Sequence, residues 1–299
     1  MGFSETAAPF FSVVVPTYNR PRELSACLAA LSGQDYPRGR YEVIVVDDGS
    51  PTPSDASHPG PEVVRFLRQP HAGPAAARNH GAAEAGGDFL AFVDDDCVPE
   101  QGWLRALAEQ LAGTTGLTAG GRTLNGLDRN PHSRTSQILS EVLLDSHRDT
   151  QGGPLFLCAN NLAVPAREFR AAGGFATAFL HPGGEDWEFC ERWRVQGGRL
   201  ILVPQAVVRH LHGMNLRGFC RQHFNYGRGA FLLRLRRAKR LGQHVRLEPA
   251  SFYTRLLART LSQPGGRRFS GTALVAASQA ATAAGFLWEA LSGTGAGDS

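Results

Sequence analysis

Four short runs of apolar, mostly β-branched residues alternate with helical patterns in the first hundred residues of the chain. Strands and helices that alternate at this spacing are typical of βαβ units, which pair their strands in a parallel sheet. The sequence therefore predicts an α/β fold. The expected strands cover residues 11–16, 41–46, 63–67 and 89–93, and the expected helices begin at Pro21 and span 73–85.

Polar clusters follow three of these four strands at the point where each strand ends. They occupy residues 16–20, 47–50 and 94–96. In an open α/β sheet, ligands bind outside the carboxyl ends of the strands, so the three clusters are expected to line one site. The chain lacks a Walker lysine motif, and no GxGxxG follows the first strand. Nucleotide hydrolysis and dinucleotide redox chemistry are therefore disfavoured.

The third cluster is a run of three carboxylates, Asp94, Asp95 and Asp96, directly after the apolar segment 89–93. Like charges at a strand end repel each other and are unfavourable to remove from water, so the run needs a counter-charge. A divalent cation carried by a diphosphate provides one, because such ions take oxygen ligands from carboxylates and phosphates. The alternative is an acidic turn that caps the next helix.

The composition is that of an ordinary globular protein. Of 299 residues, 42% are hydrophobic and 19% are charged, which suits one large α/β domain or one domain with an appendage. The five cysteines lack CxxC spacing, so we expect a reducing cytoplasm and neither a disulfide scaffold nor a zinc knuckle. The first residues show no signal-peptide pattern, and the uncharged stretch 269–288 is too rich in small and polar residues for a membrane span.

Charge is distributed unevenly along the chain. From Gly213 onward there are 13 Lys and Arg against 3 Asp and Glu, which leaves 18 basic and 24 acidic residues in 1–212. We expect this basic segment to pack on the acidic part, with some contact to a membrane surface, so that the protein lies peripherally on the inner face of the membrane. Nucleic acid is the least expected partner, because the acidic part offers no second basic patch.

Six motifs follow one another in a fixed order along residues 12–212. Together they resemble family 2 of the inverting glycosyltransferases, which have the GT-A fold. The motifs are Val-Val-Pro-Thr-Tyr-Asn-Arg at 14–20, Val-Val-Asp-Asp-Gly-Ser at 45–50, Gly-Pro-Ala-Ala-Ala-Arg-Asn-His-Gly at 73–81, Phe-Val-Asp-Asp-Asp at 92–96, Gly-Glu-Asp-Trp-Glu at 184–188, and His210.

The resemblance implies a GT-A (Rossmann-like) nucleotide-diphospho-sugar transferase fold with a helical, basic C-terminal extension. The catalytic domain is expected over residues 1–212, with a nucleotide-binding half at about 1–115 and an acceptor half at about 116–212. Patterns in the second half predict strands at 117–120 and 200–208 and a helix at 133–147. The extension is expected over residues 213–299, helical from Leu216.

In the resembled family, the first loop and the aspartate after the second strand hold the nucleotide base, which implies that Asp48 accepts a hydrogen bond from a uracil-like imide. An arginine of that family contacts the nucleotide or its phosphates, and the residue that matches it here is Arg78. Asp94 would contact the ribose. Turn chemistry alone would also explain residues 47–50. The implied nucleotide-sugar-binding set is Pro16, Thr17, Tyr18, Asn19, Asp48, Arg78, Asp94 and Asp95.

The resemblance also implies a metal and a general base. Asp96 would ligate Mn²⁺ or Mg²⁺ between the two phosphates. His210 would be a further ligand of the metal ion, and His212 is the alternative for that role. Asp186 is the implied general base for an in-line displacement with inversion. Its neighbour Glu185 could exchange roles with it or cap a helix. Candidate contacts to the sugars are Asn160, Asn161, Glu185 and Trp187, with core packing as the alternative for Trp187.

The expected donor is a UDP- or dTDP-sugar, with guanine left open as the base. The expected acceptor is a sugar-bearing or lipid-linked molecule in carbohydrate biosynthesis. Two other classes stay open. A nucleotidyltransferase would need a basic phosphate loop after the first strand, and a scaffold would bind the sugar nucleotide without turnover. Lys239 is the only lysine, and such a preference for arginine is typical of a GC-rich bacterial coding sequence.

Overall fold

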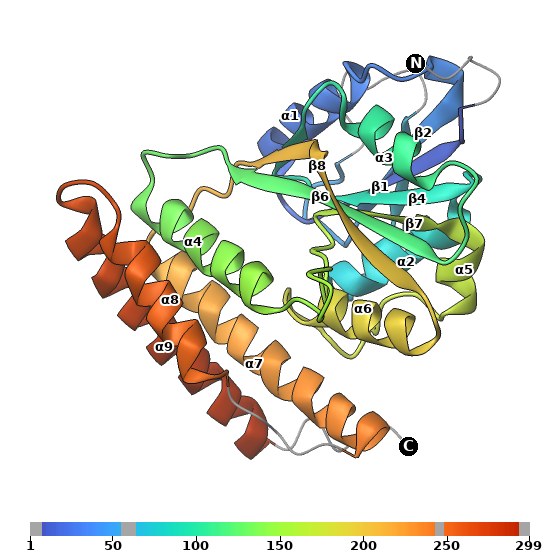
Figure 1. Cartoon of the computed structure of the whole chain (residues 1–299). Coiled ribbons are helices and arrows are strands. Elements are labelled where there is room, and N and C mark those ends of the chain that lie inside the picture. Colours follow the sequence, from blue (N-terminus) through green and yellow to red (C-terminus); the bar gives the residue numbers. More distant parts are fainter. Residues whose placement is uncertain (1–7, 55–63, 243–247, 293–299) are drawn as a thin grey trace.

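The computed structural model describes residues 8–54, 64–242 and 248–292, and within them an eight-stranded sheet forms the centre of the molecule (Figure 1). The strand order is β3-β2-β1-β4-β7-β6-β8-β5. Helices lie on both faces of this sheet, and a further layer of helices lies beside it. The predicted α/β fold is therefore confirmed.

The first four strands pair in parallel, as the alternation of the sequence predicts. β1 lies between β2 and β4, and β3 lies outside β2. Thr17 is opposite Asp47 in the β1–β2 register, so the polar loops after both strands begin side by side. The strands are β1 (Phe11–Thr17), β2 (Tyr41–Asp47), β3 (Val64–Arg68) and β4 (Phe89–Val93).

The other half of the sheet is mixed in direction. β7 is antiparallel to both β4 and β6, β8 is parallel to β6, and β5 is antiparallel to β8. Sequence patterns predicted β6 and β8, but shorter than they are, and missed β5 and β7. β7 is buried along its whole length, so no polar alternation marks it in the sequence. The strands are β5 (Cys97–Pro99), β6 (Leu117–Asn125), β7 (Asn161–Pro165) and β8 (Arg199–His210).

Each face of the sheet has its own apolar core. In β1, Val13 and Val15 belong to one core and Val14 to the other, because successive side chains of a strand point to opposite faces. α1 and α3 pack in the first core, and α2, α5 and α6 pack in the second. These helices are α1 (Pro21–Ser32), α2 (Pro74–Glu84), α3 (Trp103–Leu111), α5 (Ala166–Ala171) and α6 (Glu185–Val195), and a short 3-10 helix, η1, spans Arg38–Arg40.

The layer beside the sheet combines α4 with the C-terminal helices. α7 and α9 approach closely, since a Cβ at Gly227 would meet the carbonyl oxygen of Thr282 and one at Gly285 would meet that of Phe224. A small third core joins α4 to α8. The helices are α4 (Pro131–Ser146), α7 (Leu216–Leu241), α8 (Ala250–Leu261) and α9 (Arg267–Ser292). Among the described residues, no helix is long and apolar enough to cross a membrane.

Several basic residues of α7 form ion pairs with acidic residues of the protein. Arg237 lies 3.0 Å from Glu191 of α6, and Arg240 lies 3.0 Å from Glu188 of the same helix. Arg228 is 2.6 Å from Glu289 of α9. The two pairs with α6 agree with the expected packing of the basic segment on the acidic part of the chain. The pair with Glu289 places Arg228 between α7 and α9.

Candidate active site

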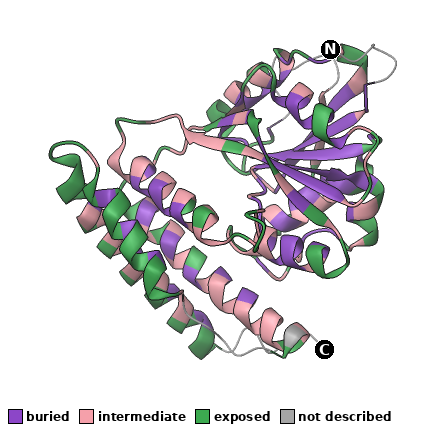
Figure 2. Ribbon diagram, in the orientation of Figure 1, coloured by how far each residue is buried: buried purple, intermediate pink, exposed green. Residues whose placement is uncertain are grey.

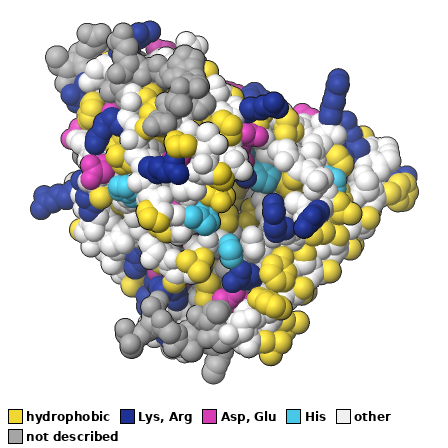
Figure 3. Space-filling model, turned by 180° about the vertical axis from the view of Figure 1, so that it is seen from behind, with side chains coloured by type: hydrophobic (Ala, Val, Ile, Leu, Met, Phe, Trp, Pro, Cys, Tyr) yellow, Lys and Arg dark blue, Asp and Glu magenta, His cyan; other side chains and the backbone are white. Residues whose placement is uncertain are grey.

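A cleft of ≈ 1660 Å³ lies between the carboxyl edge of the sheet and the layer of C-terminal helices. Figure 3 shows histidine side chains gathered across the middle of one face of the molecule, with Lys and Arg side chains beside them. The cleft brings together the site residues predicted from all six motifs, although they are far apart in the sequence. Those lining it are Pro16, Thr17, Tyr18, Asn19, Asp48, Arg78, Asp94, Asp95, Asp96, Asn160, Glu185, Asp186, Trp187 and His210.

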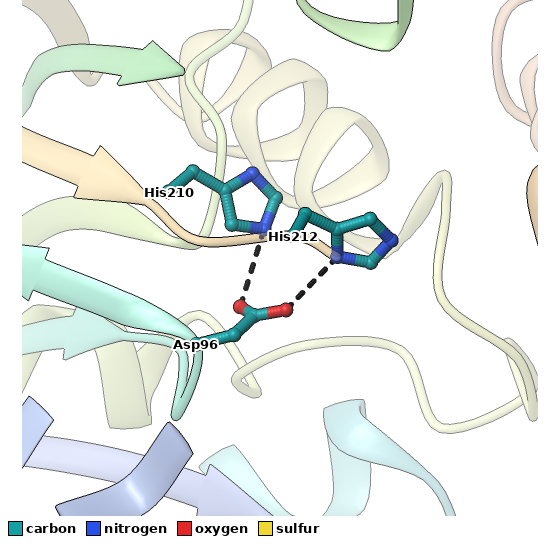
Figure 4. A group of neighbouring side chains, drawn as sticks. All are labelled: Asp96, His210 and His212. Carbon is teal, nitrogen blue, oxygen red and sulfur yellow. Dashed lines mark hydrogen bonds and ion pairs between the residues drawn. The ribbon is translucent and has the colours of Figure 1, made fainter. Parts of the chain in front are cut away.

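Asp96 lies at the meeting point of the end of β4 and the end of β8 (Figure 4). One of its carboxylate oxygens is 3.2 Å from Nε2 of His210, and the other is 2.9 Å from Nδ1 of His212. Burial alone would raise the pKa of Asp96, but His210, His212 and Arg20 outweigh burial and hold that pKa well below its usual range. Both histidines therefore converge on one ionised carboxylate, so the geometry offers both of them, and not His210 alone, as ligands.

Arg20 neutralises two members of the acidic run. Its Nη1 lies 2.8 Å from Asp96 and 3.2 Å from Asp95. Asp95 also accepts a hydrogen bond of 2.8 Å from Oγ1 of Thr17, which ties the β1 loop to the β4 loop. Burial raises the pKa of Asp95 to about 7, although Arg20 opposes the shift. Arg20 thus supplies part of the positive charge that we expected the acidic run to need.

Arg78 joins the acidic run to the start of α6. Its guanidinium donates to Asp94 at 2.6 Å and to Glu185 at 3.0 Å, and the side chain is only 5% exposed. A buried arginine between two carboxylates is fixed in orientation. Both terminal nitrogens of Arg78 therefore have protein partners, and its expected contact with the nucleotide stays a prediction.

Asp186 lies in the first turn of α6, next to Glu185. One carboxylate oxygen accepts from the N–H of Trp187 at 2.8 Å, and the other from the N–H of Ala159 at 3.4 Å. Burial raises the pKa of Asp186 to about 7, and the charge of Glu185 adds to the shift. A carboxylate with this pKa, fixed at the cleft, can accept a proton near neutral pH.

The glycines before Asp186 hold α6 close to α7. Gly184, the N-cap of α6, has φ 103°, and Gly183 has φ 119°. A Cβ at Gly183 would lie 2.6 Å from the ring of Tyr226, and one at Gly184 would lie 2.8 Å from the ring of Phe179. These positions therefore need glycine for both conformation and space.

The carboxylate of Asp48 organises the loop between β3 and α2. It accepts from the backbone N–H groups of Ala72 and Gly73 at 2.9 Å each and from Nε2 of Gln69 at 2.8 Å. Nδ1 of His71 lies 2.9 Å away. An ionised carboxylate accepts about four hydrogen bonds. Among the described residues, Asp48 thus already has a full set of partners, and the exposed His71 is the one most easily displaced by a ligand.

The neighbouring turn residues have separable roles. Tyr18 is 44% exposed and packs against His71, with ring centroids 4.3 Å apart and 30° between the ring planes. Since His71 also contacts Asp48, the two rings form an aromatic wall beside that carboxylate. Asn19 has φ 55° and donates its N–H to Oγ of Ser50, which fixes the first loop against the second. Asp47 accepts from the N–H of Ser50 and is therefore a turn-forming residue, as the turn alternative predicts.

The candidate sugar contacts fall into two groups. Trp187 stacks on Phe156 at 4.3 Å with an interplanar angle of 4°, so one of its faces is used in packing while its side chain borders the cleft. Asn160 lines the cleft and accepts from Thr123. The expectation for Asn161 is wrong. Its buried side chain accepts from Trp103 and donates to the backbone of Ala206, because β7 turns it into the core.

A family model described as Glycosyl transferase family 2 matches residues 12–168, which is more than half of the chain. The chain belongs to this family. The matched range contains the β1, β2 and β4 loops with Asp48, Asp94 and Asp96. It ends before Asp186 and His210, so this match does not bear on those two residues.

Curated relatives of this family 2 member include two named transferases. The pre-mycofactocin glycosyltransferase of Mycobacterium tuberculosis is 32% identical over 233 residues, which cover 75% of this chain and 47% of the relative. The validoxylamine A glucosyltransferase of Streptomyces hygroscopicus subsp. jinggangensis is 28% identical over 237 residues, covering 69% of this chain and 55% of the relative. The chain spans about half the length of the curated relatives it matches.

Solved structures show the same fold. The mannosyltransferase PcManGT from Pyrobaculum calidifontis, in complex with GDP-Man and Mn²⁺, aligns with a TM-score of 0.59 and 21% identity over 97% of this chain and 82% of that one. Residues 1–349 of S. aureus TarS, in complex with UDP-GlcNAc, align with a TM-score of 0.53 and 16% identity over 93% and 89%. The GT-A fold of the family 2 member is thereby confirmed.

The residues around Asp96 fit a divalent metal ion. Asp96, His210 and His212 each offer one ligand atom, and these atoms all lie within 4.8 Å of one another. One carboxylate and two imidazoles suit Mn²⁺ better than Mg²⁺, because Mg²⁺ prefers an all-oxygen shell. Arg20 shares the Asp96 carboxylate and is the group with which an incoming cation would compete.

Two residues of the cleft were missed by sequence reasoning. Arg20 stands at the end of the first motif, and the need of the acidic run for a counter-charge was the signal that could have found it. His71 lies outside the residue sets chosen from the motifs, and no local pattern predicts its contact with Asp48.

Proposed function

We propose that this protein transfers a glycosyl group from a nucleotide-diphosphate sugar to an acceptor hydroxyl, with inversion at the anomeric carbon. The main support for the proposal is that Arg78 connects two parts of the cleft. Its guanidinium connects Asp94, on the side of the metal group, to Glu185, which adjoins the candidate base Asp186. The donor would lie along the row of residues from Asp94 to Glu185, with its diphosphate towards Asp96 and its sugar towards α6.

The base of the donor would lie against the wall formed by Tyr18 and His71. Asp48 at the foot of this wall would accept the imide N–H of uracil or thymine once His71 moves aside, since His71 is an exposed partner of Asp48. Uracil and thymine each present an imide N–H to such an acceptor, so the donor proposed is a UDP- or dTDP-sugar. A GDP-sugar is the alternative, because the ring N–H of guanine can also donate to a carboxylate.

Divalent metal dependence is part of the proposal. Asp96, His210 and His212 would hold Mn²⁺, and the bound ion would supply Lewis-acid stabilisation of the negative charge on the leaving diphosphate. Asp94 would contact the ribose, and Asp95 would hold Thr17 and Arg20 in place through their hydrogen bonds. Arg20, released from Asp96, would remain beside the diphosphate as a cation.

Asp186 is the proposed general base. It would take the proton of the acceptor hydroxyl while that oxygen attacks the anomeric carbon in line with the departing diphosphate. A single carboxylate suffices for this displacement, which inverts the configuration. Glu185 cannot easily take the same role, because its oxygens accept from Arg78 and from the N–H of Gly183.

The acceptor would enter from the side of the C-terminal helices. Leu233 of α7, Phe252 and Tyr253 of α8, and Phe286 of α9 line that side of the cleft, so it suits a sugar-bearing or lipid-linked acceptor with an apolar portion. For a lipid-linked acceptor we propose peripheral contact with an anionic membrane. The exposed residues Arg217 and Lys239 remain available for such contact.

The proposed activity can be tested by donor turnover. The full chain with Mn²⁺ is incubated with UDP-, dTDP- and GDP-hexoses, and release of the nucleoside diphosphate is followed by ³¹P NMR. We expect release from uridine or thymidine donors, and its loss in Asp94→Ala but not in Asp128→Ala, an exposed carboxylate outside the cleft. Binding of a nucleotide without release from any donor, with or without candidate acceptors, would support the scaffold alternative.

A further inference from the structure

α9 carries two seams with the same spacing on opposite faces, and the outer one is entirely apolar. The inner seam consists of Gly271, Val275, Ser278, Thr282, Gly285 and Glu289, all buried or half-buried. The outer seam consists of Phe269, Ala273, Ala276, Ala280, Ala283 and Leu287, all exposed (Figure 2). Both seams repeat at intervals of four and three residues, the spacing with which one helix packs along another. The inner seam has its partners within the chain, whereas the outer seam faces solvent.

The outer face is unusual for a surface helix. No charged residue occurs between Arg268 and Glu289, and Phe269 and Leu287 are 68% and 59% exposed. A helix on the surface of a soluble protein normally carries charged or polar residues on its solvent side. An exposed, uncharged helix face of about 30 Å in length marks an interaction surface.

The seam is also symmetric about its own midpoint at Ser278. Reversed in direction, it shows the same spacing, with Phe269 opposite Leu287, Ala273 opposite Ala283, and Ala276 opposite Ala280. A twofold interface brings the same patch of two subunits together, so a self-complementary seam is what it requires. Large residues at the two ends and alanines in the middle would let two such helices approach closely in antiparallel orientation.

Charge supports the same orientation. Arg267 and Arg268 stand in the first turn of α9, where the helix dipole is positive, and this turn has no acidic residue while the last turn has no basic one. Within one chain this arrangement is unfavourable. In an antiparallel pair, the two arginines would lie beside the negative C-terminal end of the partner helix. Their interaction with that helix dipole would be favourable.

We propose that the outer face of α9 is the interface of a homodimer, in which two copies of α9 pack antiparallel about a twofold axis near Ser278. A lipid surface fits this face less well, because alanines gain little from burial in lipid and the basic residues stand at one end only. Ala283 and Leu287 also border the cleft, so the partner's Phe269 would lie near its mouth.

The oligomeric state of the full chain tests the proposal. Analytical ultracentrifugation should show a dimer, and Ala280→Arg should raise its dissociation constant about 100-fold or more by placing like charges near the axis. The matched control is Ala29→Arg, an exposed alanine of α1 on another side of the molecule, which should leave the dimer intact. A wild-type chain that is monomeric at all accessible concentrations would overturn the proposal, and vesicle binding lost only in Ala280→Arg would assign the face to lipid.

Disulfide trapping tests the antiparallel register. Ala273→Cys and Ala283→Cys chains, mixed and oxidised, should form a disulfide-linked dimer, whereas each variant alone should not. The reason is that like positions would be about 15 Å apart along the pair, beyond the reach of a disulfide. A parallel pair would instead link each variant to itself, and that result would contradict the proposed arrangement.

Discussion

The guanidinium of Arg20 lies 2.8 Å from the carboxylate of Asp96. This is the same carboxylate that contacts His210 and His212, so an arginine and two imidazoles share the proposed metal-binding oxygens. The side chain of Arg20 is 43% exposed, whereas Asp96 is buried. Arg20 can therefore turn towards solvent or towards a diphosphate when a cation takes its place.

Replacing Arg20 tests this exchange. In Arg20→Gln, the free energy of unfolding without metal should fall by about 1 kcal/mol, because Asp95 and Asp96 lose a partly exposed cationic partner. Added Mn²⁺ should then restore more stability to the variant than to the wild type. Chemical denaturation with and without Mn²⁺ measures both effects. An identical gain from Mn²⁺ in the two proteins would show that Arg20 and the ion do not compete.

Replacing Asp186 tests the general base. Asp186→Asn should lower kcat about 10²- to 10⁴-fold and leave the affinity for the donor nucleotide nearly unchanged, since a lost proton acceptor affects the chemical step alone. Kinetics with the donor identified by the turnover panel measures the first quantity, and calorimetry measures the second. The control is Asp128→Asn. A variant with full kcat would remove Asp186 from the mechanism.

The raised pKa of Asp186 predicts a pH dependence of the rate. The carboxylate must be deprotonated to act as a base, so kcat should fall as the pH is lowered through about 7. A pH–rate profile between pH 5.5 and pH 9 would show this limb. A rate that stays constant down to pH 5.5 would be inconsistent with Asp186 as the titrating base.

The same shift predicts that Asp186 destabilises the fold above neutral pH. A carboxyl whose pKa is raised in the folded state stabilises that state at low pH, and this contribution is lost as the pH rises through about 7. Asp186→Asn, which cannot ionise, should therefore have a higher Tm than the wild type at pH 8 and a similar or lower Tm at pH 5. Thermal scans at the two pH values give the comparison, and a variant less stable than the wild type at pH 8 would contradict it.

The two histidines should both contribute to metal binding. His210→Ala and His212→Ala should each weaken Mn²⁺ binding about tenfold or more, because even outer partners of metal ligands have effects of this size. Mn²⁺ titration followed by electron paramagnetic resonance measures free ion directly. His80→Ala, a histidine of α2 that contacts Gln69, is the matched control. If only one of the two substitutions weakened Mn²⁺ binding, the proposed metal ligands would be Asp96 and that histidine alone.

Much of the nucleotide-binding half could be predicted from the sequence. Its strands are short and apolar, and their loops carry Thr17, Asp48 and Asp94 directly after the strand ends, where a parallel sheet brings them together. The half of the sheet that contains antiparallel strands could not be predicted in this way. β7 pairs β4 with β6 over residues 161–165, and such long-range pairing leaves no local periodicity in a strand buried on both faces.

The side-chain partners inside the cleft were the least predictable part. The sequence indicated that Asp94, Asp95 and Asp96 needed a counter-charge, but a local pattern cannot distinguish a bound ion from Arg20 and Arg78. In the same way, Asn160 and Asn161 are equivalent in the sequence. The direction of β7 decides that Asn161 enters the core while Asn160 lines the cleft.

Metal-dependent binding of a nucleoside diphosphate tests the central claim most directly. Isothermal titration calorimetry with UDP and dTDP would compare the wild type, with and without Mn²⁺, with Asp96→Ala. The account predicts binding of at least one of the two nucleotides that weakens tenfold or more when either Mn²⁺ or the Asp96 carboxylate is removed. Equal affinity under all three conditions, or no binding of either nucleotide by the folded protein, would contradict the assignment of this cleft as a metal-assisted donor site.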